Sequence, residues 1–330
     1  MKIHKLTKKE AQRISNIFNL GKVKSITVFS GGLINSNYKL KTDKGKFVVR
    51  IIGSTMDEWK RKRLALERKT LLFLDNKKFP YEIPVPLKNM KGKYLSRING
   101  KTYWIYKMLH GKSRKRLNES QFKEMAKGMA TYHKFIKGMK FHRSKRDFKL
   151  TWFLEKYKEM REKFKRMTNG NKLDILMKDN FELLHRLVKR LSKMDFITNV
   201  LVVHGDVYGD NILFKEDKLK GFLDFDNLKI APRAEDVAYA LRLGVVSSKY
   251  GLNKRKMNSF LKEYEKINKL SKKEKEMLVP LMIRGNVIVL WWMYNEMKKE
   301  IGKKHHMIKW TLEINKHLVK EWEKQLGEKL

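Results

Sequence analysis

The first 108 residues carry several short apolar runs of the kind expected of β-strands. These runs are rich in β-branched and aromatic residues, are bounded by turn residues, and span 25–29, 37–42, 46–52, 94–98 and 102–108. Asn99-Gly100, between the last two runs, is typical of a tight hairpin turn. Helical spacing is found over 7–19 and 56–76. The pattern predicts a small antiparallel sheet accompanied by helices.

Beyond about residue 118, apolar residues recur every three or four positions, which predicts a mainly helical second part. The helices are expected over 118–137, 151–166, 173–194 and from about 234 to the end. We therefore predict an α+β chain with an N-lobe at 1–108, a C-lobe at 109–330 and a connector near 107–112.

One stretch of the second part departs from helical spacing. Residues 201–203 are apolar and predict a short strand. A loop separates them from 211–214 and 221–224, which flank a turn and predict a short hairpin. A loop followed by a tight hairpin can bring residues that are distant in sequence to one point.

The chain has 330 residues, of which 42% are hydrophobic, enough to build a sizeable core. It contains no cysteine, which excludes disulfides, thiolate zinc sites and cysteine nucleophiles. The apolar segment 287–294 is shorter than the roughly 20 residues that span a bilayer. It predicts a buried helix whose Trp291-Trp292 pair belongs to the core. The first residues lack the apolar core of a signal peptide. We expect a cytoplasmic protein with no transmembrane segment.

Lysine and arginine number 77 against 35 aspartates and glutamates, a net charge of +42. Such an excess raises the affinity for polyanions such as nucleic acid, an acidic membrane or nucleotide phosphates. The basic residues are spread evenly along the chain and form no basic tail. The charge therefore fits two explanations: non-specific contact with nucleic acid or a membrane, and a lineage whose proteins are all rich in lysine.

The chemistry-bearing residues lie in the stretch that departs from helical spacing. Asp206 is followed by Asn211 five residues later, and by Asp224 thirteen residues further on. Phosphoryl transfer needs a carboxylate to accept or orient the acceptor hydroxyl, and oxygen ligands to hold Mg²⁺ against the nucleotide phosphates. Mg²⁺ keeps several waters and needs only one or two protein carboxylates. We predict Asp206 as the catalytic base, with Asn211 and Asp224 as the metal ligands.

The segment 204–211 (His-Gly-Asp-Val-Tyr-Gly-Asp-Asn), followed by Asp-Phe-Asp at 224–226, resembles the superfamily of aminoglycoside phosphotransferases, choline kinases and homoserine kinases. The resemblance extends from about Thr27 to about Leu241. It implies a protein-kinase-like two-lobed fold, with a small antiparallel-sheet N-lobe and a larger, mainly helical C-lobe. It also implies ATP, or GTP as the alternative, as the phosphoryl donor, and Mg²⁺ as the cofactor.

The loop at 30–37 (Ser-Gly-Gly-Leu-Ile-Asn-Ser-Asn) lies where this superfamily has its nucleotide loop. Glycines there let backbone N–H groups approach phosphate closely. The resemblance therefore assigns Gly31, Gly32 and Asn37 to nucleotide binding. The loop is neither a Walker motif nor the triple-glycine pattern of dinucleotide-binding folds.

Arg50 ends the third predicted strand, where kinases usually carry the phosphate-binding lysine. Arginine keeps the charge and offers a fork of donors. Glu67 on the following helix resembles the glutamate that pairs with this cation, and Glu58 is the alternative. Met108 would lie near the connector that meets the adenine.

Other polar residues are expected to have structural roles. His204 is expected to anchor the loop backbone, and Asp210 and Asp226 to solvate or brace the loop rather than bind metal. In the superfamily that the chain resembles, Asp236 braces the catalytic loop through its backbone. His133 resembles a histidine that packs or bonds internally.

The predicted function is transfer of the γ-phosphoryl group of ATP to a hydroxyl of a small metabolite. Only eleven residues separate Asp224 from Asp236, which leaves little platform for a peptide substrate. The alternative is a kinase-like fold that serves as a basic binding module for nucleic acid or an acidic membrane. The acceptor stays open between an amino acid, a sugar, an amino alcohol and an anionic metabolite. A basic chain is less suited to polycationic aminoglycosides, although Glu263 and Glu265 could form a local acidic pocket. No oligomeric state is predicted.

Overall fold

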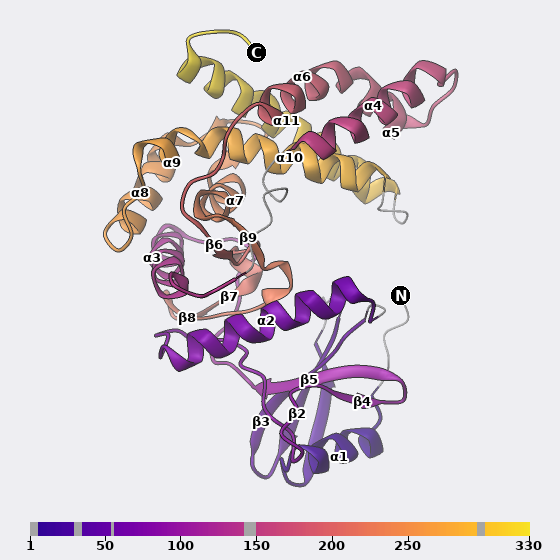
Figure 1. The fold of residues 1–330 in the computed structure, drawn as a ribbon, viewed down its shortest axis with the longest axis vertical. Coiled ribbons are helices and arrows are strands. Elements are labelled where there is room, and N and C mark those ends of the chain that lie inside the picture. The colour runs from indigo at the N-terminus through magenta and orange to yellow at the C-terminus, as the bar shows by residue number, and fades with distance from the viewer. Residues whose placement is uncertain (1–5, 30–34, 54–55, 142–149, 296–300) are drawn as a thin grey trace. The chain divides into compact units, whose positions relative to one another are not determined.

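The computed structural model describes residues 6–29, 35–53, 56–141, 150–295 and 301–330, the last segment with side chains from 305 onward (Figure 1). The chain forms two compact units. The first unit comprises residues 1–115 and 209–228, and the second comprises 116–208 and 229–330. The lobe boundary predicted at residue 108 stays a prediction, and the two units are described separately.

The first unit is built on a five-stranded antiparallel sheet with the strand order β1-β2-β3-β5-β4. Its elements are α1 (Lys8–Ile17), β1 (Val23–Val28), β2 (Ser36–Thr42), β3 (Gly45–Ile51), α2 (Glu58–Asn76), β4 (Ser96–Ile98), β5 (Lys101–Lys107), the 3₁₀ turn η2 (Gly209–Asn211), β7 (Ile212–Lys215), β8 (Lys218–Phe222) and the 3₁₀ turn η3 (Phe225–Asn227). The predicted strands and both predicted helices are confirmed. Asn99 and Gly100, with φ of 46° and 74°, form the predicted tight turn.

The two faces of this sheet pack against different helices because its side chains alternate. Tyr38, Val49 and Ile105 lie on the face that buries Ile14 of α1. Val48, Trp104 and Tyr106 lie on the other face, where Leu64 of α2 packs. Figure 1 shows α1 and α2 on opposite sides of the strands. The second face is the one that carries Arg50, which is two residues from Val48 on β3.

The β7–β8 hairpin belongs to the first unit although it follows far later in the chain. Glu82 forms a bridge to Gly221, and the Phe222 ring lies 5.7 Å from that of Tyr81. Gly221 allows this approach, because a Cβ there would lie 2.6 Å from the Glu82 carbonyl oxygen. The hairpin therefore has a fixed place in the unit that also carries Arg50.

The second unit is mainly helical, with two small two-stranded sheets. Its elements are α3 (Glu119–Ile136), α4 (Thr151–Arg166), α5 (Lys172–Asp179), α6 (Phe181–Ser192), β6 (Val200–Val203), β9 (Lys229–Pro232), α7 (Arg233–Val245), β10 (Val246–Ser247), β11 (Gly251–Leu252), α8 (Lys254–Glu265), α9 (Lys272–Glu276), α10 (Leu278–Asn295) and α11 (Ile301–Leu326). Strand β6 pairs antiparallel with β9, and β10 with β11.

Two sequence-based predictions about the helices need correction. The single helix expected over 173–194 is two helices, α5 and α6, separated at Asn180. The Asn180 amide donates to the Leu176 carbonyl at 2.8 Å, a side-chain bond that competes with helical continuation. The predicted helix at 287–294 forms as part of α10, but Trp292 is 50% exposed and does not belong to the core, whereas the half-buried Trp291 lies 5.8 Å from the Phe153 ring. Within the described part of the chain, no helix is both long and apolar enough to span a membrane.

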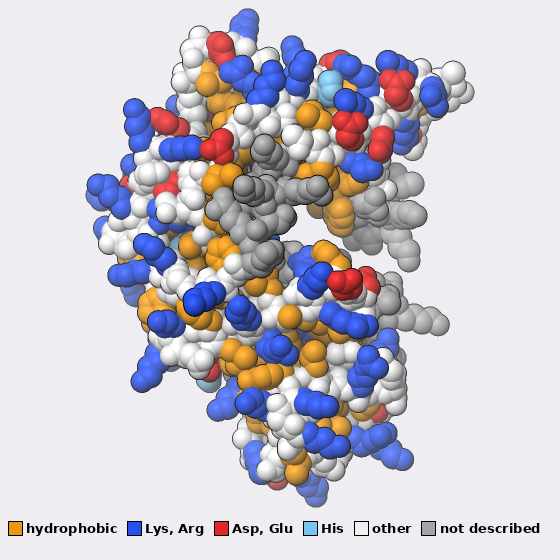
Figure 2. All heavy atoms as spheres, in the orientation of Figure 1, with side chains coloured by type: hydrophobic (Ala, Val, Ile, Leu, Met, Phe, Trp, Pro, Cys, Tyr) orange, Lys and Arg blue, Asp and Glu red, His pale blue; other side chains and the backbone are white. Residues whose placement is uncertain are grey.

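Lysine and arginine side chains are spread over the face drawn in Figure 2 instead of gathering at one place. Acidic side chains are interspersed among them, and several form ion pairs within one helix, such as Lys158–Glu155 and Lys324–Glu321. Exposed pairs of this kind add little stability.

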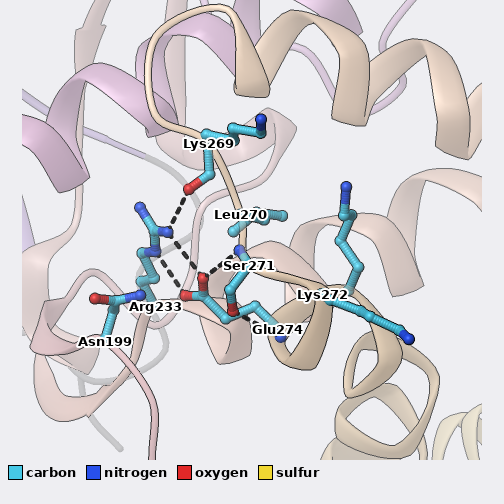
Figure 3. A pocket seen from close by; sticks show the side chains of 8 residues that line it. Asn199, Arg233, Lys269, Leu270, Ser271, Lys272 and Glu274 are labelled. Carbon is cyan, nitrogen blue, oxygen red and sulfur yellow. Dashed lines mark hydrogen bonds and ion pairs between the residues drawn. The ribbon is translucent and has the colours of Figure 1, made fainter.

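A pocket on the second unit is lined by Asn199, Arg233 and residues of the segment 269–275 (Figure 3). The buried Arg233 donates to both oxygens of Glu274, at 2.7 and 2.9 Å, and to the Lys269 carbonyl at 2.6 Å. A third nitrogen of Arg233 donates to Asn268. All three nitrogens of the guanidinium thus donate to protein groups, and Arg233 links α7 to the start of α9.

Glu274→Gln is expected to make stability less dependent on pH in acid. Burial alone would raise the pKa of Glu274, but the hydrogen bonds from Arg233 and the Ser271 amide lower it from 4.5 to about 2. A carboxylate whose pKa is lower in the folded state stabilises the fold at pH values above its unfolded pKa. This stabilisation is lost as the pH falls toward 2. Between pH 4.5 and 2, the substitution should reduce the slope of the free energy of unfolding against pH by at most about 1.4 kcal/mol per pH unit. Denaturant melts at several pH values measure this. Exposed Glu276→Gln is the control, and equal slopes in the two variants would contradict the expectation.

Candidate active site

A row of side chains crosses the first unit's sheet on the face of α2. Arg50 on β3 pairs with Asn37 on β2 and with Trp104 on β5. Residues directly opposite each other in antiparallel strands project on the same face. The Arg50 guanidinium lies 5.2 Å from the centre of the Trp104 ring. The Asn37 Oδ1 is buried and accepts no hydrogen bond from the described residues. A buried polar atom of this kind calls for a partner such as a ligand or water.

Arg50 is held by two carboxylates. Its Nη1 lies 2.6 Å from Glu67 on α2, and its Nη2 lies 2.6 Å from Asp226 in η3. The predicted pairing of Arg50 with Glu67 is therefore present, whereas the alternative Glu58 is exposed and pairs with Lys62. Both Arg50 and Glu67 are buried. The role of the pair in nucleotide binding stays a prediction.

Asp226 gathers three donors, which the sequence did not indicate. Besides Arg50, the Lys60 ammonium lies 3.6 Å from its Oδ1, and Asn35 donates to its Oδ2. Burial would raise the pKa of Asp226, but the charges of Arg50 and Lys60 outweigh it and lower the pKa. The expected bracing role of Asp226 thus takes the form of a link between β3, α2 and the segment after β8.

The other residues predicted to bind the nucleotide are Gly31, Gly32 and Met108. Gly31 and Gly32 lie outside the described residues. Met108 follows β5, and its amide donates to the Lys46 carbonyl at 3.0 Å, which extends the pairing of β3 with β5. Its side chain packs on the apolar cluster that contains Val48 and Trp104.

Asn211 and Asp224 lie at the same end of the β7–β8 hairpin. Ile212 pairs with Phe222, and one step beyond, the Leu223 amide donates to the Asn211 carbonyl at 2.8 Å. Asp224 follows directly, in the left-handed region with φ 52° and ψ 71°. A non-glycine residue held there is strained, and such strain is often found at functional sites.

This donor set fits Mg²⁺. An amide oxygen and an exposed carboxylate are hard ligands, and Mg²⁺ needs few protein ligands because it keeps waters and substrate phosphates. No group of three or more His, Cys, Asp or Glu side chains in the described part of the chain could hold a metal by itself. A metal site here would therefore require nucleotide oxygens as well.

The second unit carries Asp206, and Asp236 braces the loop around it. Asp236 is buried on α7, and its oxygens accept from the backbone amides of His204 at 2.8 Å and Gly205 at 2.7 Å. The His133 Nε2 lies 3.1 Å from Asp236, and its Nδ1 lies 2.7 Å from the Tyr264 hydroxyl. Since a carboxylate only accepts, His133 donates from Nε2. The bracing expected of Asp236 and the internal bonding expected of His133 are both present.

Tyr239 is a site residue that the sequence analysis missed. It lies three residues after Asp236 on α7, and its hydroxyl donates to Asp206 Oδ1 at 2.5 Å. Burial and the Asp206 charge raise the pKa of Tyr239, so the phenol remains a donor. The i, i+3 spacing puts Asp236 and Tyr239 on neighbouring positions of one helix surface, a signal that was present in the sequence.

Comparisons with known proteins identify the family and the fold. The model of the phosphotransferase enzyme family matches residues 25–266, so the chain belongs to that family. The homoserine kinase of Phenylobacterium zucineum is 24% identical over 282 residues, which cover 85% of this chain and 82% of that one. A spectinomycin phosphotransferase bound to ADP and spectinomycin has a TM-score of 0.66 at 15% identity, covering 94% of this chain and 97% of that one. A microcompartment-associated aminopropanol kinase has a TM-score of 0.67 at 14% identity, covering 96% of each chain.

These similarities confirm the predicted α+β, kinase-like fold. The chain is a phosphotransferase with an alcohol acceptor, a kinase of small metabolites. Neither the family nor the similar proteins support the alternative of a basic binding module.

Proposed function

We propose that the phosphoryl donor is ATP, with GTP as the alternative, and that Mg²⁺ assists its transfer to the acceptor hydroxyl. The observation that carries this proposal is the end of the β7–β8 hairpin, where the Asn211 carbonyl is bonded next to the strained Asp224. An adenine nucleotide is also bound in the spectinomycin phosphotransferase structure.

The proposed roles follow from the chemistry of each group. Asn211 and Asp224 would hold the Mg²⁺, which when bound neutralises charge on the transferring phosphoryl group. Arg50, kept in place by Glu67 and Asp226, would orient the nucleotide phosphates together with the loop at 30–37. Asp206, anchored by Tyr239, would accept the acceptor's hydroxyl proton.

The proposed acceptor is a small hydroxylated metabolite of the size of homoserine or an amino alcohol. A homoserine kinase and an aminopropanol kinase are among the similar proteins. Compounds of this size are also compatible with a chain of net charge +42, which is unsuited to large polycations.

Mg-ATP is expected to raise the melting temperature. At a hundredfold excess over its dissociation constant, a ligand of the folded state adds about 2.7 kcal/mol. For a chain of 330 residues, this corresponds to a rise of about 4 °C. The shift should fall when EDTA removes Mg²⁺, and it should persist at 0.5 M salt because a buried phosphate site is screened little. Differential scanning fluorimetry measures it.

A panel of hydroxylated metabolites read by ADP release then identifies the acceptor. A thermal shift that vanishes at high salt, together with no ADP release from any compound, would contradict the proposed nucleotide and its use. CTP serves as the control nucleotide, because its phosphates match those of ATP and its base does not.

A further inference from the structure

Arg242 on α7 is a buried cation without a carboxylate partner among the described residues. Among the described residues, four arginines are buried: Arg50, Arg233, Arg242 and Arg284. The other three each lie within 3 Å of a carboxylate. Buried charges are normally paired, because removing an ion from water is costly. Arg242 is therefore the exception that needs a counter-ion.

Asp206 is close enough for its charge to oppose the lowering of the Arg242 pKa by burial, but the side chains that the guanidinium contacts directly are neutral. Its Nη1 donates to Asn286 on α10 at 2.7 Å, and Asn286 donates to Asn315 on α11 at 3.0 Å. The Nε of Arg242 and the Nδ2 of Asn315 are buried and donate to no described group. Two unused donors thus accompany a buried guanidinium that forms no direct ion pair with a described carboxylate, which is the chemistry that recognises an anion.

Arg242 lies beside the proposed base. Its guanidinium is 5.1 Å from the centre of the Tyr239 ring, and the Tyr239 hydroxyl donates to Asp206. One tyrosine side chain therefore separates the cation from the carboxylate that would accept the hydroxyl proton. Burial lowers the pKa of Arg242. Arg233 shows the opposite shift: burial would lower its pKa too, but the hydrogen bond to Glu274 raises it.

We propose that Arg242 binds a carboxylate of the acceptor, so that the enzyme phosphorylates hydroxy acids and hydroxy amino acids in preference to the corresponding neutral or cationic alcohols. Planar guanidinium groups suit carboxylates because they donate two parallel hydrogen bonds. Asn286 holds the guanidinium, and Asn315 offers a second donor. This inference rests on the proposed role of Asp206, because it places the acceptor's hydroxyl at that residue.

Matched acceptors that differ only in the carboxylate test the inference. The pairs are L-homoserine with 3-amino-1-propanol, L-serine with ethanolamine, and D-glycerate with ethylene glycol. We expect kcat/KM for ADP release to favour the acid in at least one pair by about 10²-fold, the size of effect that a desolvated charge pair gives. If no pair favours the acid, the inference is wrong.

Arg242→Ala should lower kcat/KM for the preferred acid, mainly through KM, by about 10²-fold more than for its partner without the carboxylate. Residual turnover of that partner also reports that the variant is folded. Should Arg242→Ala not fold, Arg242→Lys keeps a charge without the fork and should lose about tenfold for the acid alone. Arg255→Ala, at an exposed position of α8, is the control and should match the parent.

An equal loss for both members of a pair would overturn the inference, because a purely structural arginine acts on every acceptor alike. Transfer to neutral alcohols with no preference for acids would overturn it while leaving the proposed function intact. Absence of ADP release with every acceptor would overturn the proposed function as well.

Discussion

Replacing Asp206 with asparagine is expected to lower kcat for ADP release by about 10²–10⁴-fold, the usual contribution of a general base. Asparagine keeps the shape of the side chain and can still accept the Tyr239 hydrogen bond, but it cannot take the acceptor's proton. Because Asp206 is not among the residues proposed to hold phosphate or metal, the Kd of Mg-ATP should stay within about threefold. Steady-state ADP release and calorimetric nucleotide titration measure the two quantities.

Asp217→Asn is the matched control for this variant. Asp217 is an exposed acid in the turn between β7 and β8, so the same change of charge there should leave both kcat and nucleotide affinity as in the parent. Turnover of Asp206→Asn at the parent rate would remove Asp206 from its role. A loss of nucleotide affinity equal to the loss of kcat would instead indicate a structural or metal-binding part for this carboxylate.

The first unit could be predicted well because its signals are local. Runs of β-branched and aromatic residues bounded by turn residues indicate strands, and this placed β2, β3 and β5 within one or two residues of their positions. Asn99-Gly100 marks its turn by chemistry alone, since both residues have positive φ. The pair of Arg50 with Glu67 was expected from the family resemblance, and one strand and the helix after it supply both residues.

The features that escaped prediction are short or depend on distant partners. Strands β10 and β11 have two residues each, too few for any periodicity. The break at Asn180 depends on a single side-chain bond within otherwise continuous helical spacing. Asp226 meets Arg50 across 176 positions of the chain, and Tyr239 meets Asp206 across 33. Hydrogen bonds of that range exist only once the fold has brought their elements together.

The functional role of the positive charge also depends on contacts that form only in the folded chain. Composition alone gives +42 and points to polyanions in general. The structure distinguishes among the basic residues instead: Arg50 and Arg233 form direct ion pairs with buried carboxylates, while Arg242 forms none with the described residues. A buried charge interacts more strongly with its neighbours and is screened less by salt than the surface excess. Function is therefore better inferred from the Arg242 guanidinium than from the net charge of the whole chain.

Asp236→Ala is expected to lower the free energy of unfolding by about 3–5 kcal/mol, the cost of breaking a buried charged network by removing one partner. The loss leaves the amides of His204 and Gly205 and the Nε2 of His133 without their acceptor. Each unsatisfied buried donor costs about 1–3 kcal/mol. Because the two amides directly precede Asp206, ADP release should fall as well, even at temperatures where the variant is folded. Chemical denaturation and ADP release measure the two effects.

Asp236→Asn separates the hydrogen bonds from the charge, since its amide oxygen can still accept while its NH₂ cannot. It should lose less stability than Asp236→Ala. Asp179→Ala, at an exposed position on α5, should change stability by less than about 0.5 kcal/mol. If Asp236→Ala proved as stable and as active as Asp179→Ala, the backbone of the Asp206 loop would have to be held by other contacts, and the bracing assigned to α7 would be wrong.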